Sequence, residues 1–445
     1  MLANIVEKWC LRGWYKNQKI PDLCGGAEQL RMAEQLGFTI RQRDIRPLDF
    51  ILSLIDALAG DGNCDTQADL HRKFNELTGL NVSYRSWANQ AKKDALPTLI
   101  LWLWVQCLEI FSRKVMAFDE DSPFSEFEHI LIQDGSSQAV YDALKEAFPG
   151  RFSTVSPAAV ELHTTMDLLT NNLVRVQLTE DTRSERDCLP PLPTSMAYIL
   201  MLMDAGYFEL ELFAAIDDRE GSFICKAPQS INPTILSAVR EDGKNPNRYK
   251  GQKLKDVLSG FPKDQCLDLD VEWPGFKAWP FRLVVRWNDK KQKWVFVVTN
   301  LNRVEFTLSD VLQAYRLRWQ IELIFKEIKS YSGWHRFNTK SATLVFSLIL
   351  MSFVVVTLKR YLAHAAQANL CESGSIEEIS THKVMKSGTH LFGNVISSLI
   401  NAGKSLVSCI KKLLDFWGNN AKREHPARDG CSGRTRLGFC AVGGA

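Results

Sequence analysis

The sequence of 445 residues has little of what would assign it to several large protein classes. Its 11 cysteines are scattered and form no CxxC pair, so the ligand spacing of zinc ribbons and zinc fingers is absent. Their odd number and the lack of a secretory signal favour reduced thiols in a cytoplasmic protein. The net charge of +3 is near zero for this length and does not by itself predict a nucleic-acid partner. No internal repeat is visible.

The composition is that of a globular protein, with 45% hydrophobic and 24% charged residues. The length suggests about two to four domains. The first 120 residues are mainly periodic in the way of helices. We expect helices over 27–36, 47–58, 67–77, 83–93 and 97–116.

Two of these helices, 67–77 and 83–93, are compatible with a helix-turn-helix, since Gly79 supplies a turn between them and Ser83 can cap the second. The second helix would present residue types suited to phosphates and base edges: Tyr84, Arg85, Asn89, Gln90, Lys92 and Lys93. Most helical hairpins bind no DNA, so this pattern is weak on its own.

One segment is long and apolar enough to need a membrane check. Ser341 to Leu358 contains 18 residues without a charge, close to the minimum for a spanning helix. The alternative is a buried helix covering a sheet. A single borderline span so late in the chain favours burial, although a membrane-anchored protein stays open as a rival.

Two apolar runs lead into an aspartate. The first is 129–134, which predicts a strand ending at Asp134 and followed by Gly135. The second is 196–203, a candidate buried strand followed by Asp204. Taken singly, such residues are commonly turn formers or helix caps. If the strands are neighbours, the two carboxylates meet at one sheet edge.

Between and after these runs the pattern is less regular. We expect strands over 158–164, 173–178, 207–216 and 221–226, and a hairpin formed by 278–287 and 293–300. Residues 230–280 look irregular, and 391–417 forms one amphipathic helix candidate.

The stretch 315–329 predicts one helix with two distinct sides. At roughly 100° per residue, Tyr315, Arg318, Glu322 and Lys329 lie within about 60° of one another. The apolar residues fall on a neighbouring, core-facing side. A surface helix with ordinary ion pairs is one interpretation. The other is a carboxylate for a metal ion, flanked by cations for a phosphate backbone.

The pattern Tyr-x2-Arg-x3-Glu-x6-Lys resembles the YREK signature of bacterial insertion-sequence transposases, the DDE enzymes of the insertion-sequence-four group. Asp134-Gly-Ser and Asp204-x-Gly-Tyr-Phe are similar to the first and second motifs of the same family. The resemblance implies cut-and-paste transposition. It also implies that Asp134, Asp204 and Glu322 hold two Mg²⁺ or Mn²⁺ ions about 4 Å apart.

The same resemblance implies further roles and partners. Tyr315, Arg318 and Lys329 would hold phosphates of the transposon end, and Trp294 would stack on a base flipped out of the duplex. The partners would be inverted-repeat ends and target DNA, with a homodimer in the synaptic complex and no membrane. The alternatives are a catalytically silent DNA-binding derivative and a metal-dependent nuclease without strand transfer.

The implied fold class is α/β (α+β) with an RNase H-like catalytic core. The expected domains are a helical N-terminal DNA-binding region over 1–120, the first part of the core over 121–218, a β-rich insertion over 219–305, the Glu helix and last core helix over 306–362, and a C-terminal helical region with a loose basic tail over 363–445.

Overall fold

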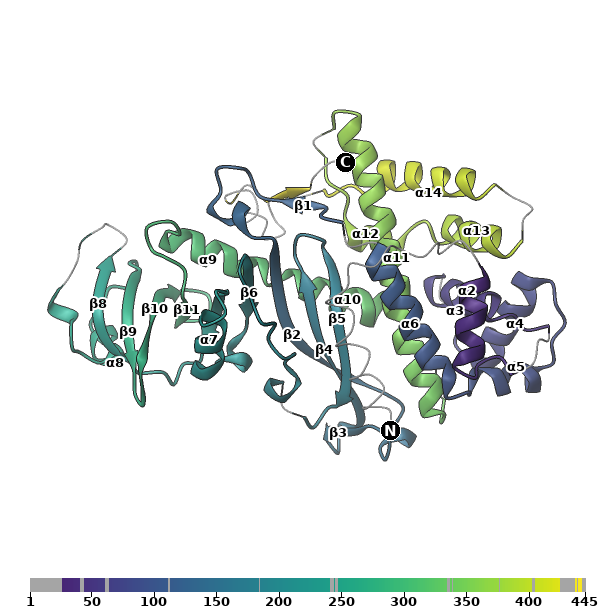
Figure 1. The fold of residues 1–445 in the computed structure, drawn as a ribbon, viewed down its shortest axis with the longest axis horizontal. Coiled ribbons are helices and arrows are strands. Elements are labelled where there is room, and N and C mark those ends of the chain that lie inside the picture. The colour runs from purple at the N-terminus through teal and green to yellow at the C-terminus, as the bar shows by residue number, and fades with distance from the viewer. Residues whose placement is uncertain are drawn as a thin grey trace.

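A long mixed sheet runs from the middle of the molecule to one end, and a group of helices forms the other end (Figure 1). The computed structural model describes residues 26–40, 44–60, 64–110, 113–183, 185–240, 244, 247–333, 337, 339–375, 377–401, 405–424, 437 and 439–441. Most of the predicted basic tail therefore lies outside the described residues, as do the first 25 residues.

The main sheet has ten strands in the order β3-β4-β2-β6-β7-β11-β10-β9-β8, with β5 paired to β4. Its members are β2 (His129–Ala139), β3 (Pro149–Phe152), β4 (Ser156–Asp167), β5 (Asn172–Glu180), β6 (Ile199–Met203), β7 (Ser222–Ala227), β8 (Thr234–Arg240), β9 (Leu267–Trp273), β10 (Phe276–Asn288) and β11 (Lys293–Thr299). The pairs β2–β6 and β6–β7 are parallel, and the others are antiparallel. Because β7 pairs with β6, and β11 with β7, the strands of the predicted insertion continue the central sheet.

The sheet separates two hydrophobic cores, and β6 contributes to both. Leu200 and Leu202 belong to one core, whereas Met201 and Met203 belong to the other. Successive side chains of a strand point to opposite faces, so a strand covered on both faces is apolar throughout. All five residues of β6 are buried, which explains its continuous apolar sequence.

The N-terminal helices are α2 (Gly26–Gln35), α3 (Pro47–Ala59), α4 (Gln67–Thr78), α5 (Tyr84–Ala91) and α6 (Ala95–Ile110). The local signals for α4 and α5 act as expected. Thr66 and Asp69 form a capping box at the start of α4, and Gly79 ends it in the left-handed conformation. Ser83 caps α5 through the N–H of Ser86.

The long apolar segment lies inside the protein. It belongs to α11 (Ala342–Glu372), and 83% of its most apolar window is buried. Trp104 of α6 donates a hydrogen bond to the Thr357 hydroxyl of α11 at 3.0 Å. The helix passes between the sheet and the N-terminal helices, which accounts for its apolar residues without a membrane (Figure 1).

The C-terminal region returns to the core. It contains α12 (Thr381–Lys386), α13 (Thr389–Ile400), α14 (Leu406–Asn420) and β12 (Cys440–Ala441). Strand β12 pairs with β1 (Met116–Ala117), so two segments far apart in the sequence lie side by side.

Three local predictions are wrong. Residues 391–417 form two helices, because α13 ends at Asn401 in an extended conformation and Ser405 begins α14. The segment 207–216 is mainly helix α7 (Leu210–Asp217), since Phe213 and Ile216 are buried at helical rather than alternating spacing. The stretch 230–280, predicted to be irregular, contains β8, β9 and α8 (Leu254–Leu258), and β8 is the edge strand of the sheet.

Candidate active site

Asp134 and Asp204 lie side by side on neighbouring parallel strands. In the β2–β6 register Gln133 is opposite Met203. Asp134 and Asp204 are the next residues along the two segments, so they are neighbours. Asp204 follows the end of β6 and accepts a hydrogen bond from the N–H of Gly206 at 2.6 Å. The strand prediction for Asp134 is wrong in one respect: β2 continues to Ala139, because β4 pairs with it along its whole second half.

The glycine after each aspartate leaves room for a carboxylate that the sequence patterns did not single out. A Cβ at Gly206 would lie 2.5 Å from Glu185 Oε2, and a Cβ at Gly135 would lie 3.0 Å from Glu185 Oε1. Burial raises the pKa of Glu185, and the nearby Asp204 charge raises it further. Because Glu185 comes from a loop with no motif, only the folded structure reveals it.

The predicted helix 315–329 is two helices, α9 (Leu308–Leu317) and α10 (Gln320–Tyr331). Arg318 and Trp319 stay in the right-handed helical region between them. At the junction the backbone hydrogen bonds join residues three apart, as in a 3₁₀ turn. The Arg318 N–H, for example, donates to the Tyr315 carbonyl at 3.2 Å. The helix is therefore wound more tightly at the junction, and the chain does not turn back on itself. Glu322 lies in the first turn of α10.

Arg318 joins two of the predicted site carboxylates. Its Nη1 donates to Asp134 Oδ2 at 2.6 Å, and its Nη2 lies 3.5 Å from Glu322 Oε1. The pKa of Asp134 is nevertheless raised to about 7, because burial outweighs Arg318 and the charges of Glu322 and Asp204 add to it. The carboxylates of Asp134, Asp204 and Glu322 all act on the Arg318 charge, and together they outnumber it.

Lys329 and Tyr315 reach the same end of the sheet. Lys329 Nζ donates to Ser136 Oγ at 2.7 Å and also to the Ser137 carbonyl. Burial lowers the pKa of Lys329, opposed by Glu322. Burial raises the pKa of Tyr315, opposed by Arg318. The phenol stays neutral and can act as a hydrogen-bond donor.

Trp294 and Trp319 differ in their exposure. Trp294 is half-buried on β11, with its ring 5.1 Å from that of Trp287 and 6.1 Å from that of Phe261. Trp319, at the α9–α10 junction next to Arg318, is 58% exposed. An apolar ring left open beside charged groups is available to a partner.

The carboxylates provide hard oxygen donors, which suit Mg²⁺ or Mn²⁺. Within the described part of the chain, no three acidic, histidine or cysteine side chains already stand close enough to hold one ion. Arg318 instead occupies one oxygen of Asp134. The donor chemistry and the excess negative charge fit divalent cations, and an ion would compete with Arg318 for Asp134.

Comparison with known proteins places this chain in a family. Residues 126–358, more than half of the chain, match the profile of the family described as "Transposase DDE domain". The chain belongs to the DDE transposase family. The matched segment includes Asp134, Asp204 and Glu322 and ends inside α11.

Among curated relatives, the DDE transposase is 22% identical over 294 residues to the transposase of insertion sequence element IS1151 from Clostridium perfringens. That match covers 55% of this chain and 61% of the relative. It is 20% identical to the transposase of IS231B from Bacillus thuringiensis subsp. berliner, over 88% of this chain and 89% of the relative.

Among solved structures, the piggyBac transposase synaptic complex with hairpin DNA matches 97% of this chain and 89% of that chain, with a TM-score of 0.43 and 12% identity.

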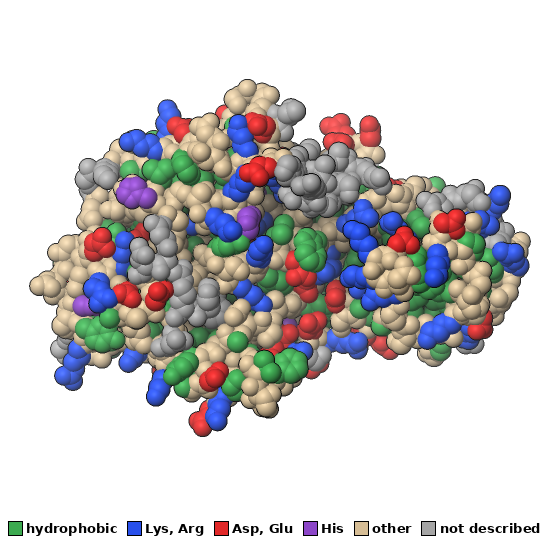
Figure 2. All heavy atoms as spheres, turned by 180° about the vertical axis from the view of Figure 1, so that it is seen from behind, with side chains coloured by type: hydrophobic (Ala, Val, Ile, Leu, Met, Phe, Trp, Pro, Cys, Tyr) green, Lys and Arg blue, Asp and Glu red, His purple; other side chains and the backbone are tan. Residues whose placement is uncertain are grey.

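The surface around the sheet is strongly charged although the whole DDE transposase is nearly neutral. Figure 2 shows Asp and Glu side chains gathered near the middle of one face, with Lys and Arg side chains on both sides and toward the β8–β11 end. Local charge of both signs is compatible with metal ions at the centre and a polyanion around them.

Proposed function

We propose that this DDE transposase excises an insertion sequence and joins it to target DNA by two-metal phosphodiester chemistry. One observation supports the proposal: the parallel register of β2 and β6 sets Asp134 beside Asp204, and the Arg318 side chain that pairs with Asp134 also lies 3.5 Å from Glu322 of α10. The match of the chain to insertion-sequence transposases supports it. We assign the enzyme to the insertion-sequence-four group with the YREK signature and an RNase H-like core.

In this proposal Asp134, Asp204 and Glu322 hold two Mg²⁺ or Mn²⁺ ions. When bound, the ions activate the attacking oxygen and stabilise the leaving one. Arg318, which pairs with Asp134 in this structure, would be able to bind a phosphate with two parallel hydrogen bonds if Asp134 held a cation instead. Lys329 supplies a point charge and Tyr315 a neutral donor to the same DNA strand.

The partners in this proposal are the inverted-repeat ends of the element and target DNA, with a homodimer in the synaptic complex. Helices α4 and α5 provide a helix-turn-helix for the ends. Trp294 is assigned to stacking on a flipped base, and the exposed ring of Trp319 offers a second contact with DNA.

The test uses the full chain, a duplex carrying the inverted repeats that flank its gene, Mg²⁺ and a second plasmid as target. We expect nicked and joined products from the wild type. D134N, D204N and E322Q should bind the ends but lower cleavage by at least about 1,000-fold, since each removes a metal ligand. D119N changes an exposed acid and serves as the control.

Other results would contradict the proposal in distinct ways. Binding without nicking by the wild type would favour a silent derivative. Nicking without joining would favour a nuclease. Full activity of all three variants would show that these carboxylates do not hold the catalytic metal ions.

A further inference from the structure

The helix that carries Glu322 is also held from its opposite side. Glu327 lies five residues further along α10, about 140° around the helix axis from Glu322. It is only 1% exposed, although it carries a carboxylate. Its Oε2 accepts from Arg360 Nη1 of α11 at 2.7 Å, and its Oε1 accepts from the Thr381 hydroxyl of α12 at 2.7 Å.

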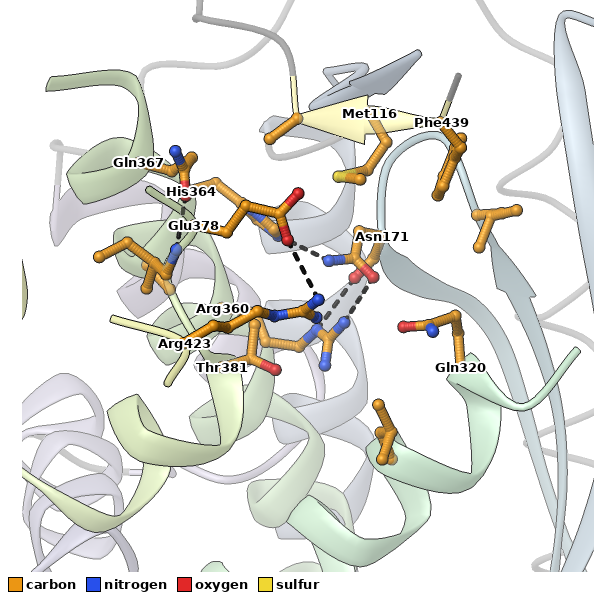
Figure 3. A pocket seen from close by; sticks show the side chains of 15 residues that line it. Met116, Asn171, Gln320, Arg360, His364, Gln367, Glu378, Thr381, Arg423 and Phe439 are labelled. Atoms are coloured by element: carbon orange, nitrogen blue, oxygen red, sulfur yellow. Dashed lines mark hydrogen bonds and ion pairs between the residues drawn. The ribbon is translucent and has the colours of Figure 1, made fainter. Parts of the chain in front are cut away.

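Arg360 extends this contact to the sheet. Its Nε donates to the Asn171 carbonyl at 2.9 Å, and its Nη2 donates to Asn171 Oδ1 at 2.7 Å. Figure 3 shows the guanidinium facing Asn171 with Thr381 nearby. Asn171 lies in the turn between β4 and β5 with a φ of 52°, a conformation that asparagine tolerates.

These four residues, Asn171, Glu327, Arg360 and Thr381, are called the Glu327 clamp below. Through Asn171 the clamp reaches β4, and β4 pairs with β2 so that Thr164 stands opposite Asp134. Through Glu327 it reaches the helix of Glu322. The clamp therefore links the strand neighbouring one candidate metal ligand to the helix of another.

The C-terminal region contacts α10 a second time. The rings of Tyr331, the last residue of α10, and His382 of α12 are 5.0 Å apart. Lys386 Nζ lies 5.0 Å from the centre of the same Tyr331 ring. Helix α12 thus follows the second half of α10, beyond the segment that matches the family.

A fully buried ion pair is a poor source of stability, because apolar residues of similar volume often serve as well or better. What such a pair adds is a defined geometry, here with all three guanidinium nitrogens and both carboxylate oxygens engaged. A displacement of about 1 Å at a catalytic group can cost about 100-fold in rate.

We propose that the C-terminal region sets the position of Glu322 through the Glu327 clamp, with Thr381 as a positioning residue. This inference rests on the proposed role of Glu322 as a metal ligand. It assigns a function to α12, which lies outside the segment that the family profile matches. A transposase lacking this contact would fold and bind DNA but present its third carboxylate poorly.

The choice of variant follows from the burial of the pair. Removing Glu327 or Arg360 would leave an uncompensated buried charge and endanger the fold. T381V removes one hydroxyl and keeps the ion pair, and T381S restores the hydroxyl. T357V is the matched control, since it removes a buried hydroxyl of α11 whose hydrogen bond comes from Trp104 of α6.

The experiment compares full-length T381V, T381S and T357V with the wild type. We measure the unfolding midpoint, binding of end DNA, the Mg²⁺ dependence of cleavage, and Mn²⁺ binding by electron paramagnetic resonance. T381V should cleave roughly tenfold more slowly at saturating DNA and need more Mg²⁺. It should bind Mn²⁺ more weakly than T357V, with a similar midpoint and similar DNA binding, and T381S should resemble the wild type.

The inference is overturned if T381V and T357V share the same Mg²⁺ dependence and the same Mn²⁺ affinity. It is also overturned if T381V loses only DNA binding. Failure of the proposed function looks different, because then the wild type itself cuts no DNA. The Mn²⁺ comparison still tests the clamp in that case, since it does not require cleavage.

Discussion

At the scale of single residues, burial decides the protonation of the side chains around the sheet. The pKa of Asp134 is raised to about 7 despite its contact with Arg318, and that of Glu161 is raised to about 7 despite Arg151, in both cases first by burial. In a DDE transposase, a carboxylate of this kind gains most from a bound cation, because the cation stabilises the charged form that burial penalises.

His163 on β4 predicts an acid sensitivity of the fold. The ring is 2% exposed, and burial lowers its pKa to about 4. The unfolded chain binds a proton near its ordinary pKa of about 6.5, so stability falls as the pH drops from about 6.5 to about 4. The fold should lose about 3 kcal/mol over that window from this residue.

The measurement is the free energy of unfolding of the wild type and H163Q at several pH values. The advantage of the wild type over H163Q should shrink with falling pH. H390Q changes an exposed histidine and controls for the chemistry of the substitution. A pH-independent difference between the wild type and H163Q would contradict the assignment.

At the scale of elements, the position of α9 and α10 depends on how each one begins. A capping box of Thr307 and Asp310 starts α9. The tightened turn at Arg318 then passes the chain into α10, which is held by Lys329 on the sheet side and by the Glu327 clamp on the other. If α9 and α10 formed one continuous helix, the Arg318 and Glu322 side chains would point in different directions relative to each other.

Two capping boxes in the described part of the chain provide a matched pair of variants. T307A and T66A each remove the same cap, from α9 and α4. Each should cost about 1 kcal/mol of stability. Only T307A should lower cleavage at saturating DNA, because α9 leads directly into Arg318. Equal loss of cleavage in T66A, measured in the same assay, would show that the effect is not specific to this element.

At the scale of the whole molecule, segments distant in sequence close the core. The Phe439 ring packs 4.7 Å from that of Phe118, next to the β1–β12 pair, and both residues are buried. The N-terminal helices, the sheet and the C-terminal helices contribute to one core cluster. The C-terminal region is therefore part of the folded body.

F439A should destabilise the protein by about 3 kcal/mol, the usual cost of removing a buried phenyl ring. V407A, at a position 76% exposed on α14, should change little. Chemical denaturation of both variants measures the difference. A loss of stability in F439A no larger than that in V407A would mean that Phe439 does not contribute to the core.

Local patterns predicted best the elements that have a clear period together with a capping or turn residue. The helices 47–58 and 67–77 and the hairpin 278–300 follow from periodicity and from capping or turn residues. The error at 207–216 arose where a short apolar run fits more than one period. The error at 391–417 is a break between two helices, at Asn401 and Ser405, in a pattern that is helical on both sides. The sequence gives no local sign of the break between α9 and α10. Its two residues, Arg318 and Trp319, keep helical backbone angles, so no glycine or proline is needed there.

By itself the sequence determined which residue types stand at the site: two aspartates after or within apolar strands, and a glutamate flanked by cations on a helix. These features depend on residues close together in the chain, and the sequence shows their spacing directly. Only the tertiary structure decided that Arg318 pairs with Asp134, that Glu185 lies against two glycines, and that Thr381 holds Glu327. Each of these contacts joins residues from different elements, and no spacing along the chain encodes which elements pack together.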